Sequence, residues 1–420
     1  MKQDIICAGA LDEQTLGDAV AGFFRTVRPE RERLYDYYAG EQPVPKGEAV
    51  RGRPNNRLRV PFPRYITEVH TGYFLGVPPT LTFPTAAETE AFAALSAEEG
   101  LPGLLFAAAR DMSVCGVGFL LVWLERAGLR VSRCDPRDCF AIRDATAGNP
   151  LRGTVRLYQR PDGVTEGVLY QAAMLRFFTW DGATLRWDGG EKNLLGALSL
   201  IPFSNNLDGV GDFAEVTGLV DAYNLLLSGA MDDMQSVANA FLALYGMQGT
   251  TQKDVDEANR TRILSLSEGG RAEFVVKNLN QDALNTLEGN LRRSILQLSM
   301  TPDLSDESFS GNASGVALQY KLWGIEQVRA AKERAFTNGL RRLLAALSGG
   351  FAVLGQSIAL QGTPTFYKNL PQNTDSLCQT LLSLEGVLSH RTILENLPWV
   401  TDVDEELRRK AEETRHKTEE

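Results

Sequence analysis

The chain has 420 residues, a length that accommodates two or three domains or subdomains. Its hydrophobic content of 43% and charged content of 23% are ordinary for a globular protein and exclude a disordered or collagen-like chain. The formal net charge of -10 is spread along the sequence, so a broad basic surface for DNA phosphates is not expected, and any contact with nucleic acid should be local or loose.

Helical periodicity dominates the first 115 residues. It predicts one helix over 12–39, interrupted near Pro29 and stopped by Gly40, and further helices over 65–75, 86–99 and 104–115. Between the first two lies PVPKGEAVRGRPNNR, a stretch typical of a surface loop or arm, with the cations Lys46, Arg51, Arg53, Arg57 and Arg59 in and just after it. This arm could bind nucleic acid or meet acidic residues of another subunit, and the lack of interleaved aromatic residues favours the second.

Residues 116–200 change to β-prone runs separated by glycine, aspartate and proline turns, which predicts an antiparallel meander. Gly116 and Gly118 match only the front of a dinucleotide-binding fingerprint, so we interpret them as turn glycines.

Long helices dominate the second half. Apolar residues alternate by three and four over 217–245, which predicts an amphipathic helix roughly 40 Å long. After it we expect a short helix begun by Thr251 and Asp254, the strands ILSLS and AEFVVK, and a helix over 281–299. A polar acidic loop, a third long helix to about Leu347, a hairpin in SIALQGTPTFYKNLP, two polar helices over 375–388 and 390–397, and a charged tail complete the pattern.

A search for reactive chemistry yields no catalytic residue. Asp232 and Asp233 could suggest a two-metal nuclease, but adjacent helical positions point about 100° apart and do not converge on one ion. Asp303, Asp306 and Glu307 lack the spacing of a calcium loop. The five scattered cysteines predict reduced thiols, and no apolar run is long enough to span a membrane. We therefore expect no metal, no cofactor and no membrane partner.

Five segments, in this order, resemble the bacteriophage portal protein family, in the branch common in tailed phages of Gram-positive hosts. They are LYDYYAGEQPV (34–44), RPNNRLRVPFPRYITEVHTGYFLGVPP (53–79), IPFSNN followed by LVDAYNLLLSGAMDD (201–233), SGVALQYKLWGIEQ (314–327) and LSHRTILENLPWVTDVDEEL (388–407).

This resemblance implies an α+β portal-like fold. Its parts would be a mixed wing (1–216), a stem helix (217–246), a small α/β clip (247–280), a second stem helix (281–299), a tunnel loop (300–313), a long wing helix (314–348), a hairpin (349–372) and a helical crown (373–420).

The resemblance also implies a function. The chain would form a ring, commonly of twelve copies, at one capsid vertex of the virion, after assembly in the host cytoplasm. Double-stranded DNA would pass through the ring during packaging and ejection, and the terminase large subunit, the head-tail adaptor, and capsid and scaffolding proteins would be its partners. A minor head protein and a DNA-processing, metal-dependent nuclease are the alternatives.

Candidate site residues follow from the idea that DNA moving through a channel should meet few phosphate-binding cations, because each such contact adds affinity. We expect a repulsive acidic lining from Asp221, Asp232 and Asp233 on the stem. In the tunnel loop the candidates are Asp303, Asp306, Glu307, Ser308, Ser310 and Asn312. The ring interface candidates are Leu219, Tyr223, Leu226, Met234, Val237 and Phe241, and the clip would bind partners through Lys253, Arg260, Arg262 and Arg271.

Overall fold

The structure is a computed structural model. It describes residues 4–49, 54–125, 128–238, 241–245, 251–261, 271–275, 280–305, 315–369, 383, 386–395, 397, 400, 403 and 406–411. The fold is of the α+β class, and the chain divides into two compact units, Met1–Lys368 and Asn369–Glu420. Among the helices described, none is both long and apolar enough to cross a membrane.

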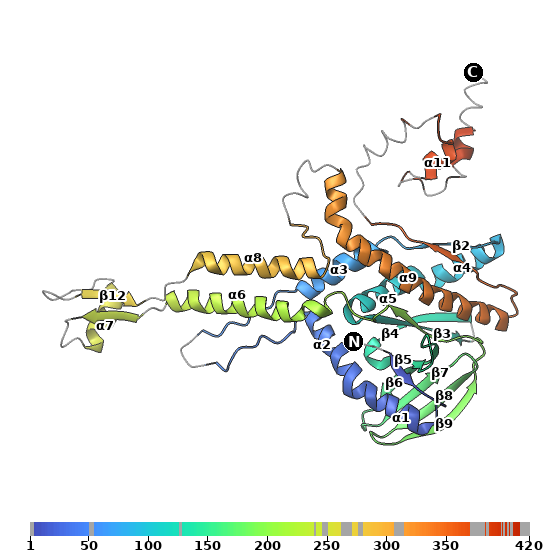
Figure 1. Ribbon diagram of the computed structural model, residues 1–420, viewed down its shortest axis with the longest axis horizontal. Coiled ribbons are helices and arrows are strands. Elements are labelled where there is room, and N and C mark those ends of the chain that lie inside the picture. The colour runs from blue at the N-terminus through green and yellow to red at the C-terminus, as the bar shows by residue number, and fades with distance from the viewer. Residues whose placement is uncertain are drawn as a thin grey trace. The chain divides into compact units, whose positions relative to one another are not determined.

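The predicted first helix forms (Figure 1), and its middle contains a wider, π-helical turn. Its parts are α1 (Glu13–Gly22), the π-helical turn η1 (Phe23–Val27) and α2 (Arg28–Ala39). Asp12 caps the start by accepting a hydrogen bond from the Thr15 amide at 2.8 Å. The wide turn directly precedes Pro29, whose missing N–H and bulky ring disfavour a regular α-helical hydrogen bond at that point.

The next three helices lie where the sequence predicts them, except that two begin three residues earlier, and a short strand follows the first of them. They are α3 (Phe62–Leu75), β2 (Thr80–Thr82), α4 (Ala86–Glu99) and α5 (Leu101–Cys115). Gly116 ends α5 with a φ of 86°, so its interpretation as a turn glycine is confirmed. Gly118 instead lies within a strand, where an added Cβ would be 2.4 Å from the Ala108 carbonyl oxygen. It is therefore a position of close contact with α5 and not a turn.

Residues 116–200 are mostly strand, as predicted, but they form two sheets. The larger has the order β1-β5-β6-β7-β8-β9, and the smaller has the order β10-β3-β4. Strands β5 to β9 are the expected antiparallel meander, and β1 joins its edge in parallel. Their bounds are β1 (Ile5–Cys7), β3 (Val117–Glu125), β4 (Gly128–Cys134), β5 (Cys139–Asp144), β6 (Leu151–Gln159), β7 (Thr165–Tyr170), β8 (Met174–Trp180), β9 (Leu185–Lys192) and β10 (Leu200–Ser204), with the short 3-10 turns η2 (Pro136–Asp138) and η3 (Ala214–Val216).

The long helix α9 (Gly315–Val353) packs on the smaller sheet. Gly339 allows this approach, because an added Cβ there would lie 2.3 Å from the Phe203 ring. The predicted hairpin after α9 is wrong: β13 (Thr363–Thr365) pairs antiparallel with the distant β2. The core that results joins α3, α5, α9 and the smaller sheet.

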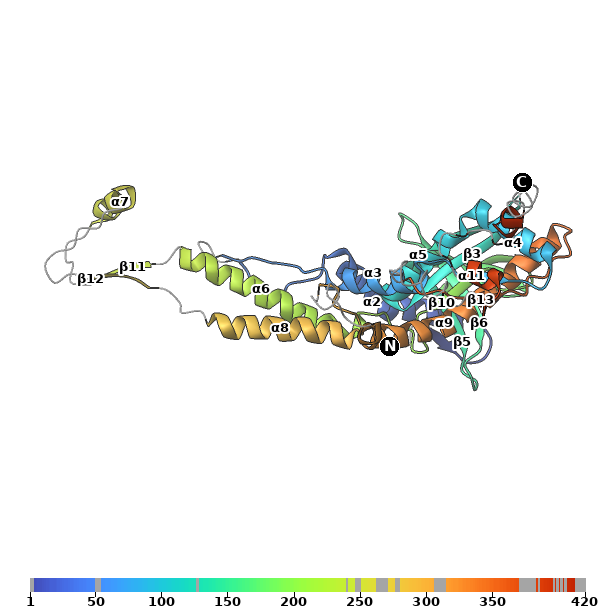
Figure 2. The same ribbon diagram turned by 90° about the horizontal axis from the view of Figure 1, so that it is seen from above.

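Two helices run side by side in both views, α6 (Thr217–Ala238) and α8 (Gln281–Leu298) (Figures 1 and 2). The sequence predicted that the first would continue to Tyr245, which is wrong, because Phe241–Tyr245 is strand β11 and pairs antiparallel with β12 (Arg271–Val275). Aromatic and bulky apolar residues in FLALY and RAEFV favour this pairing over helix. Between the strands, α7 (Gln252–Thr261) begins as expected, with Asp254 accepting a hydrogen bond from the Thr251 amide at 2.7 Å.

In the second unit the structure describes α11 (His390–Glu395), within the predicted helix over 390–397. Ser389 caps it by accepting a hydrogen bond from the Thr392 amide at 3.2 Å. Residues 375–382 of the other predicted helix, and the ILSLS segment of the first unit, lie outside the described residues.

Candidate functional site

The paired helices α6 and α8 are joined to the body of the first unit by a shared apolar cluster. Val220 and Tyr223 of α6 and Ile295 and Leu296 of α8 are all buried in it. The Tyr223 ring packs edge-on against Phe62 with centroids 5.0 Å apart, and its hydroxyl donates to Glu288 of α8.

Two residues expected at a ring interface thus serve the subunit's own packing. Tyr223 is only 7% exposed, and Leu219 packs half-buried against the same cluster. Little of either side chain remains for contact with another copy.

The arm after Pro43 returns along α6 in extended form and is held there by a ladder of hydrogen bonds. The backbone N–H groups of Asn56, Leu58 and Val60 donate to the side chains of Asp232, Ser228 and Asn224, at 2.7, 2.9 and 2.8 Å. Both Ser228 and Asn224 are fully buried beneath it.

The spacing of this ladder has a simple physical basis. Alternate residues of an extended chain point the same way and advance by about 6.7 Å, whereas four residues of an α-helix advance by about 6.0 Å and return to nearly the same face. Donors two apart on the arm therefore meet acceptors four apart on α6, with the two segments running in opposite directions. The polar stripe of α6 therefore binds the chain's own arm.

This arrangement changes the interpretation of the acidic residues on α6. Asp232 forms an ion pair with Lys46. The hydrogen bond that the Lys46 ammonium donates is the largest cause that holds the pKa of Asp232 below its usual value. Asp221 accepts a hydrogen bond from the Tyr37 hydroxyl at 2.7 Å. Two of the three carboxylates expected to line a channel as bare charges, Asp221 and Asp232, thus have partners in their own subunit. The sequence suggested that the cations of the arm meet acidic residues of another subunit. The acidic partner of Lys46 is instead Asp232 of the same chain.

Exposed apolar side chains on the paired helices are a feature that the sequence only partly predicted. Met234 is 64% exposed on α6, as a residue available to another copy should be, and Leu226 is half-buried. Leu225 and Met231 on α6, and Leu287 and Leu298 on α8, are also exposed and were not predicted. The side chains of Val237 and Phe241 lie outside the described residues.

At the base of the paired helices, two polar contacts are buried in the protein. His70 of α3 donates its Nε2–H to the Ser299 carbonyl oxygen at 3.0 Å, and burial lowers the pKa of this imidazole to about 4. Lys332 of α9 forms an ion pair with Asp212, with side chains only 2% and 4% exposed. Asp212 also accepts hydrogen bonds from Ser113 and Asn205.

The loop that follows α8 is fixed at its start. Burial opposes ionisation of Asp303, but hydrogen bonds from Ser305 and the charge of Arg292, 3.0 Å away, outweigh it and lower the pKa of Asp303. Tyr65 binds the same loop by donating to the Pro302 carbonyl oxygen and accepting from the Leu304 amide. The other residues predicted for the tunnel loop lie outside the described residues. They are Asp306, Glu307, Ser308, Ser310 and Asn312.

The cations predicted to bind partners lie on α7 and at the start of β12, as far as the structure describes them. Lys253, Arg260 and Arg271 are exposed, and Arg262 is outside the described residues. Within the described part of the chain, no group of three His, Cys, Asp or Glu side chains could hold a metal ion, while Cys7, Cys115, Cys134 and Cys139 are buried free thiols.

Comparison with known proteins adds a family relationship. A family model described as phage portal protein, SPP1 Gp6-like, matches residues 25–420. The portal protein of Bacillus phage SPP1 is 25% identical over 232 residues, which cover 54% of this chain and 46% of that protein. The portal protein of Clostridium phage phiCD119 is 24% identical over 215 residues, which cover 50% of this chain and 47% of that protein. The chain spans about half the length of the curated relatives it matches.

A solved structure, described as the neck of a native GTA particle computed with C12 symmetry, shares the fold. The TM-score is 0.51 with 12% sequence identity, and the match covers 81% of this chain and 90% of that chain.

Proposed function

Because the chain belongs to the SPP1 Gp6-like family of phage portal proteins, we propose that it assembles into a ring at one capsid vertex. Double-stranded DNA passes through this ring during packaging and ejection. The fold shared with a chain from a C12-symmetric neck particle supports twelve copies.

The observation that carries the proposal is that two faces of α6 have different surroundings. Its polar stripe is covered by the chain's own arm, while Leu225, Met231 and Met234 remain exposed. An apolar strip on a subunit surface is stabilised by association, and identical copies that associate head to tail can close into a ring.

The finer assignments belong to the same proposal. Helices α6 and α8 form the stem, β11, α7 and β12 form the clip, the loop from Thr301 onward approaches DNA, and residues 373–420 form the crown. The exposed cations of the clip contact the terminase large subunit and then the head-tail adaptor, while capsid and scaffolding proteins meet other surfaces. The ring is part of the virion, and it assembles in the host cytoplasm.

A direct test is the size and shape of the purified full chain. Mass photometry should give about twelve times the 46.1 kDa of one chain, and negative-stain micrographs should show a ring with a central hole. Monomers at every protein concentration would contradict the proposal, and magnesium-dependent cleavage of plasmid DNA would favour the nuclease instead.

A further inference from the structure

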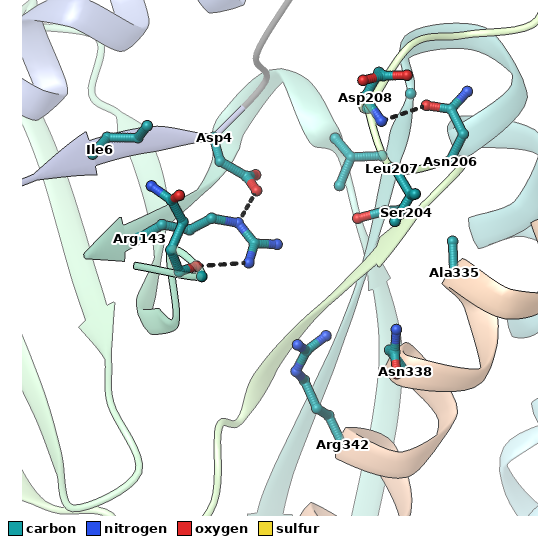
Figure 3. Close-up of a pocket in the computed structure, with 15 residues that line it drawn as sticks. Asp4, Ile6, Arg143, Ser204, Asn206, Leu207, Asp208, Ala335, Asn338 and Arg342 are labelled. Atoms are coloured by element: carbon teal, nitrogen blue, oxygen red, sulfur yellow. Dashed lines mark hydrogen bonds and ion pairs between the residues drawn. The ribbon is translucent and has the colours of Figure 1, made fainter. Parts of the chain in front are cut away.

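A pocket of about 380 Å³ opens on the first unit (Figure 3). Five segments that are distant in sequence line it: β1 and the residue before it, Gly116 with the start of β3, the end of β5 with the turn after it, the end of β10 with the loop to Gly209, and one face of α9. Nothing in the proposed passage of DNA uses this pocket.

The α9 face of the pocket carries hydrogen-bond donors for which the described residues supply no acceptor. Asn338 and Arg342 lie four residues apart and both project into the pocket in Figure 3. The Asn338 oxygen accepts from Arg341 at 3.3 Å, so its amide N–H groups remain. Among the described residues, neither the half-buried Arg342 guanidinium nor the Ser204 hydroxyl across the pocket has a hydrogen-bond or ion-pair partner.

The carboxylate whose charge acts on Arg342, that of Asp4, is already engaged. Asp4 forms an ion pair with Arg143, which also donates to the Asn149 carbonyl oxygen at 3.1 Å. Burial lowers the pKa of Arg342, and the charge of Arg143 adds to this, while Asp4 acts against it. Asp208 lies at the opposite end of the pocket, beside Leu207 (Figure 3). Arg342 is therefore a partly desolvated cation that forms no ion pair with any carboxylate in the part of the chain that the structure describes.

The loop beside these donors presents a leucine to solvent. Leu207 is 99% exposed, yet its loop is tightly held, because Asn206 accepts from the amides of Asp208 and Val210 at 3.1 and 3.0 Å. The backbone of Gly209 also packs closely on Gly116, because a Cβ added at Gly116 would lie 2.0 Å from the Gly209 carbonyl oxygen. An exposed apolar side chain on a loop whose backbone is held in this way suits contact with another protein surface.

We propose that this pocket is a joint between neighbouring copies of the chain. An acidic side chain of one copy enters the pocket and binds Arg342 of the next, with Asn338 and Ser204 as further donors and Leu207 packed against the same neighbour. A guanidinium and a carboxylate form strong charge-assisted hydrogen bonds. The occupant is a second copy because each chain carries 53 acidic against 43 basic residues, and a head-to-tail contact brings this face against a different face of its neighbour.

The first test uses a short-range crosslink and rests on the proposed ring. In R342K the introduced amine can be joined to a touching carboxylate by a carbodiimide, without a spacer. Rings mixed from nitrogen-14 and nitrogen-15 subunits should then give peptides that link the two isotopes. Links to Asp4 of the same isotope alone, or no link in intact rings, would overturn the joint.

The second test compares charge reversals on α9. In R342E we expect the protein concentration for half-assembly, measured by mass photometry, to rise at least about tenfold, because two carboxylates would then face each other. R334E is the control, since Arg334 is exposed on the same helix and does not line the pocket. Equal effects in both variants, or none in R342E, would refute the joint. Absence of rings in the unmodified protein would instead refute the proposed function.

Discussion

Lys332 and Asp212 show how much one buried pair can matter. In Lys332→Met we expect a loss of about 3 to 5 kcal/mol in the free energy of unfolding, because Asp212 would keep its charge in the interior without a cation. Urea unfolding followed by fluorescence measures this. Adding Asp212→Asn should restore most of the loss, since an amide oxygen can still accept from Asn205. A double variant as unstable as the single one would contradict this account.

His70 makes stability depend on pH. Its pKa is about 4 in the folded protein, against about 6.5 in an unfolded chain, so the unfolded state binds the additional proton between these values. Stability therefore falls as pH decreases through this window, by about 2 kcal/mol at pH 5 relative to pH 7.

The variant His70→Gln isolates this effect. It keeps a donor for the Ser299 carbonyl oxygen but does not titrate. The difference in unfolding free energy between the two proteins should shrink from pH 7 to pH 5, and a constant difference would show that His70 is not the responsible group.

At the scale of elements, the ladder between the arm and α6 can be tested by proteolysis. Ser228→Ala removes the acceptor of the Leu58 amide, which costs about 1 to 2 kcal/mol for the attached state of the arm. Trypsin should then cut after the exposed Arg57 roughly 5 to 30 times faster, because cleavage needs a detached arm.

A matched serine controls this experiment. Ser236 lies two turns further along α6, is exposed, and donates only to the Asp232 carbonyl oxygen. Ser236→Ala should leave cleavage after Arg57 unchanged. Equal acceleration in both variants would indicate a general loosening of α6 and not loss of the ladder.

The sequence was informative where a local pattern decides the structure. The periodicity of α3, α4, α5 and α8 and the capping pair at Thr251 were sufficient. The pairing of distant strands could not be predicted from the sequence, since nothing in TLT or TPT indicates that β2 pairs with β13. The sequence showed the polar stripe of α6, and we predicted that it lines a channel. Its partner in the subunit, the arm, was not recognised because it lies some 170 residues earlier.

At the scale of the whole molecule, the pocket at Arg342 was missed for the same reason. Its donors come from segments that the fold alone brings together, and each looks ordinary in sequence. The five segments that resemble portal proteins gave the family correctly, because an ordered set of motifs depends on no single contact.

The exposed apolar strip on α6 yields the prediction that bears on the assembly itself. In Met234→Asp the isolated subunit should fold normally, since Met234 is 64% exposed. Each subunit contact would lose the burial of one methionine, about 1.5 to 3 kcal/mol, and would gain a desolvated charge. We expect size-exclusion chromatography with light scattering to give mainly the 46.1 kDa monomer, with an unchanged circular dichroism spectrum.

Met174→Asp provides the comparison, because Met174 is 44% exposed on β8, away from the paired helices. This variant should assemble as the unmodified chain does. Full rings from Met234→Asp would mean that the strip on α6 faces something other than a neighbouring copy. The stem would then have to close through α8, where Leu287 and Leu298 are the exposed apolar residues left to make the contact.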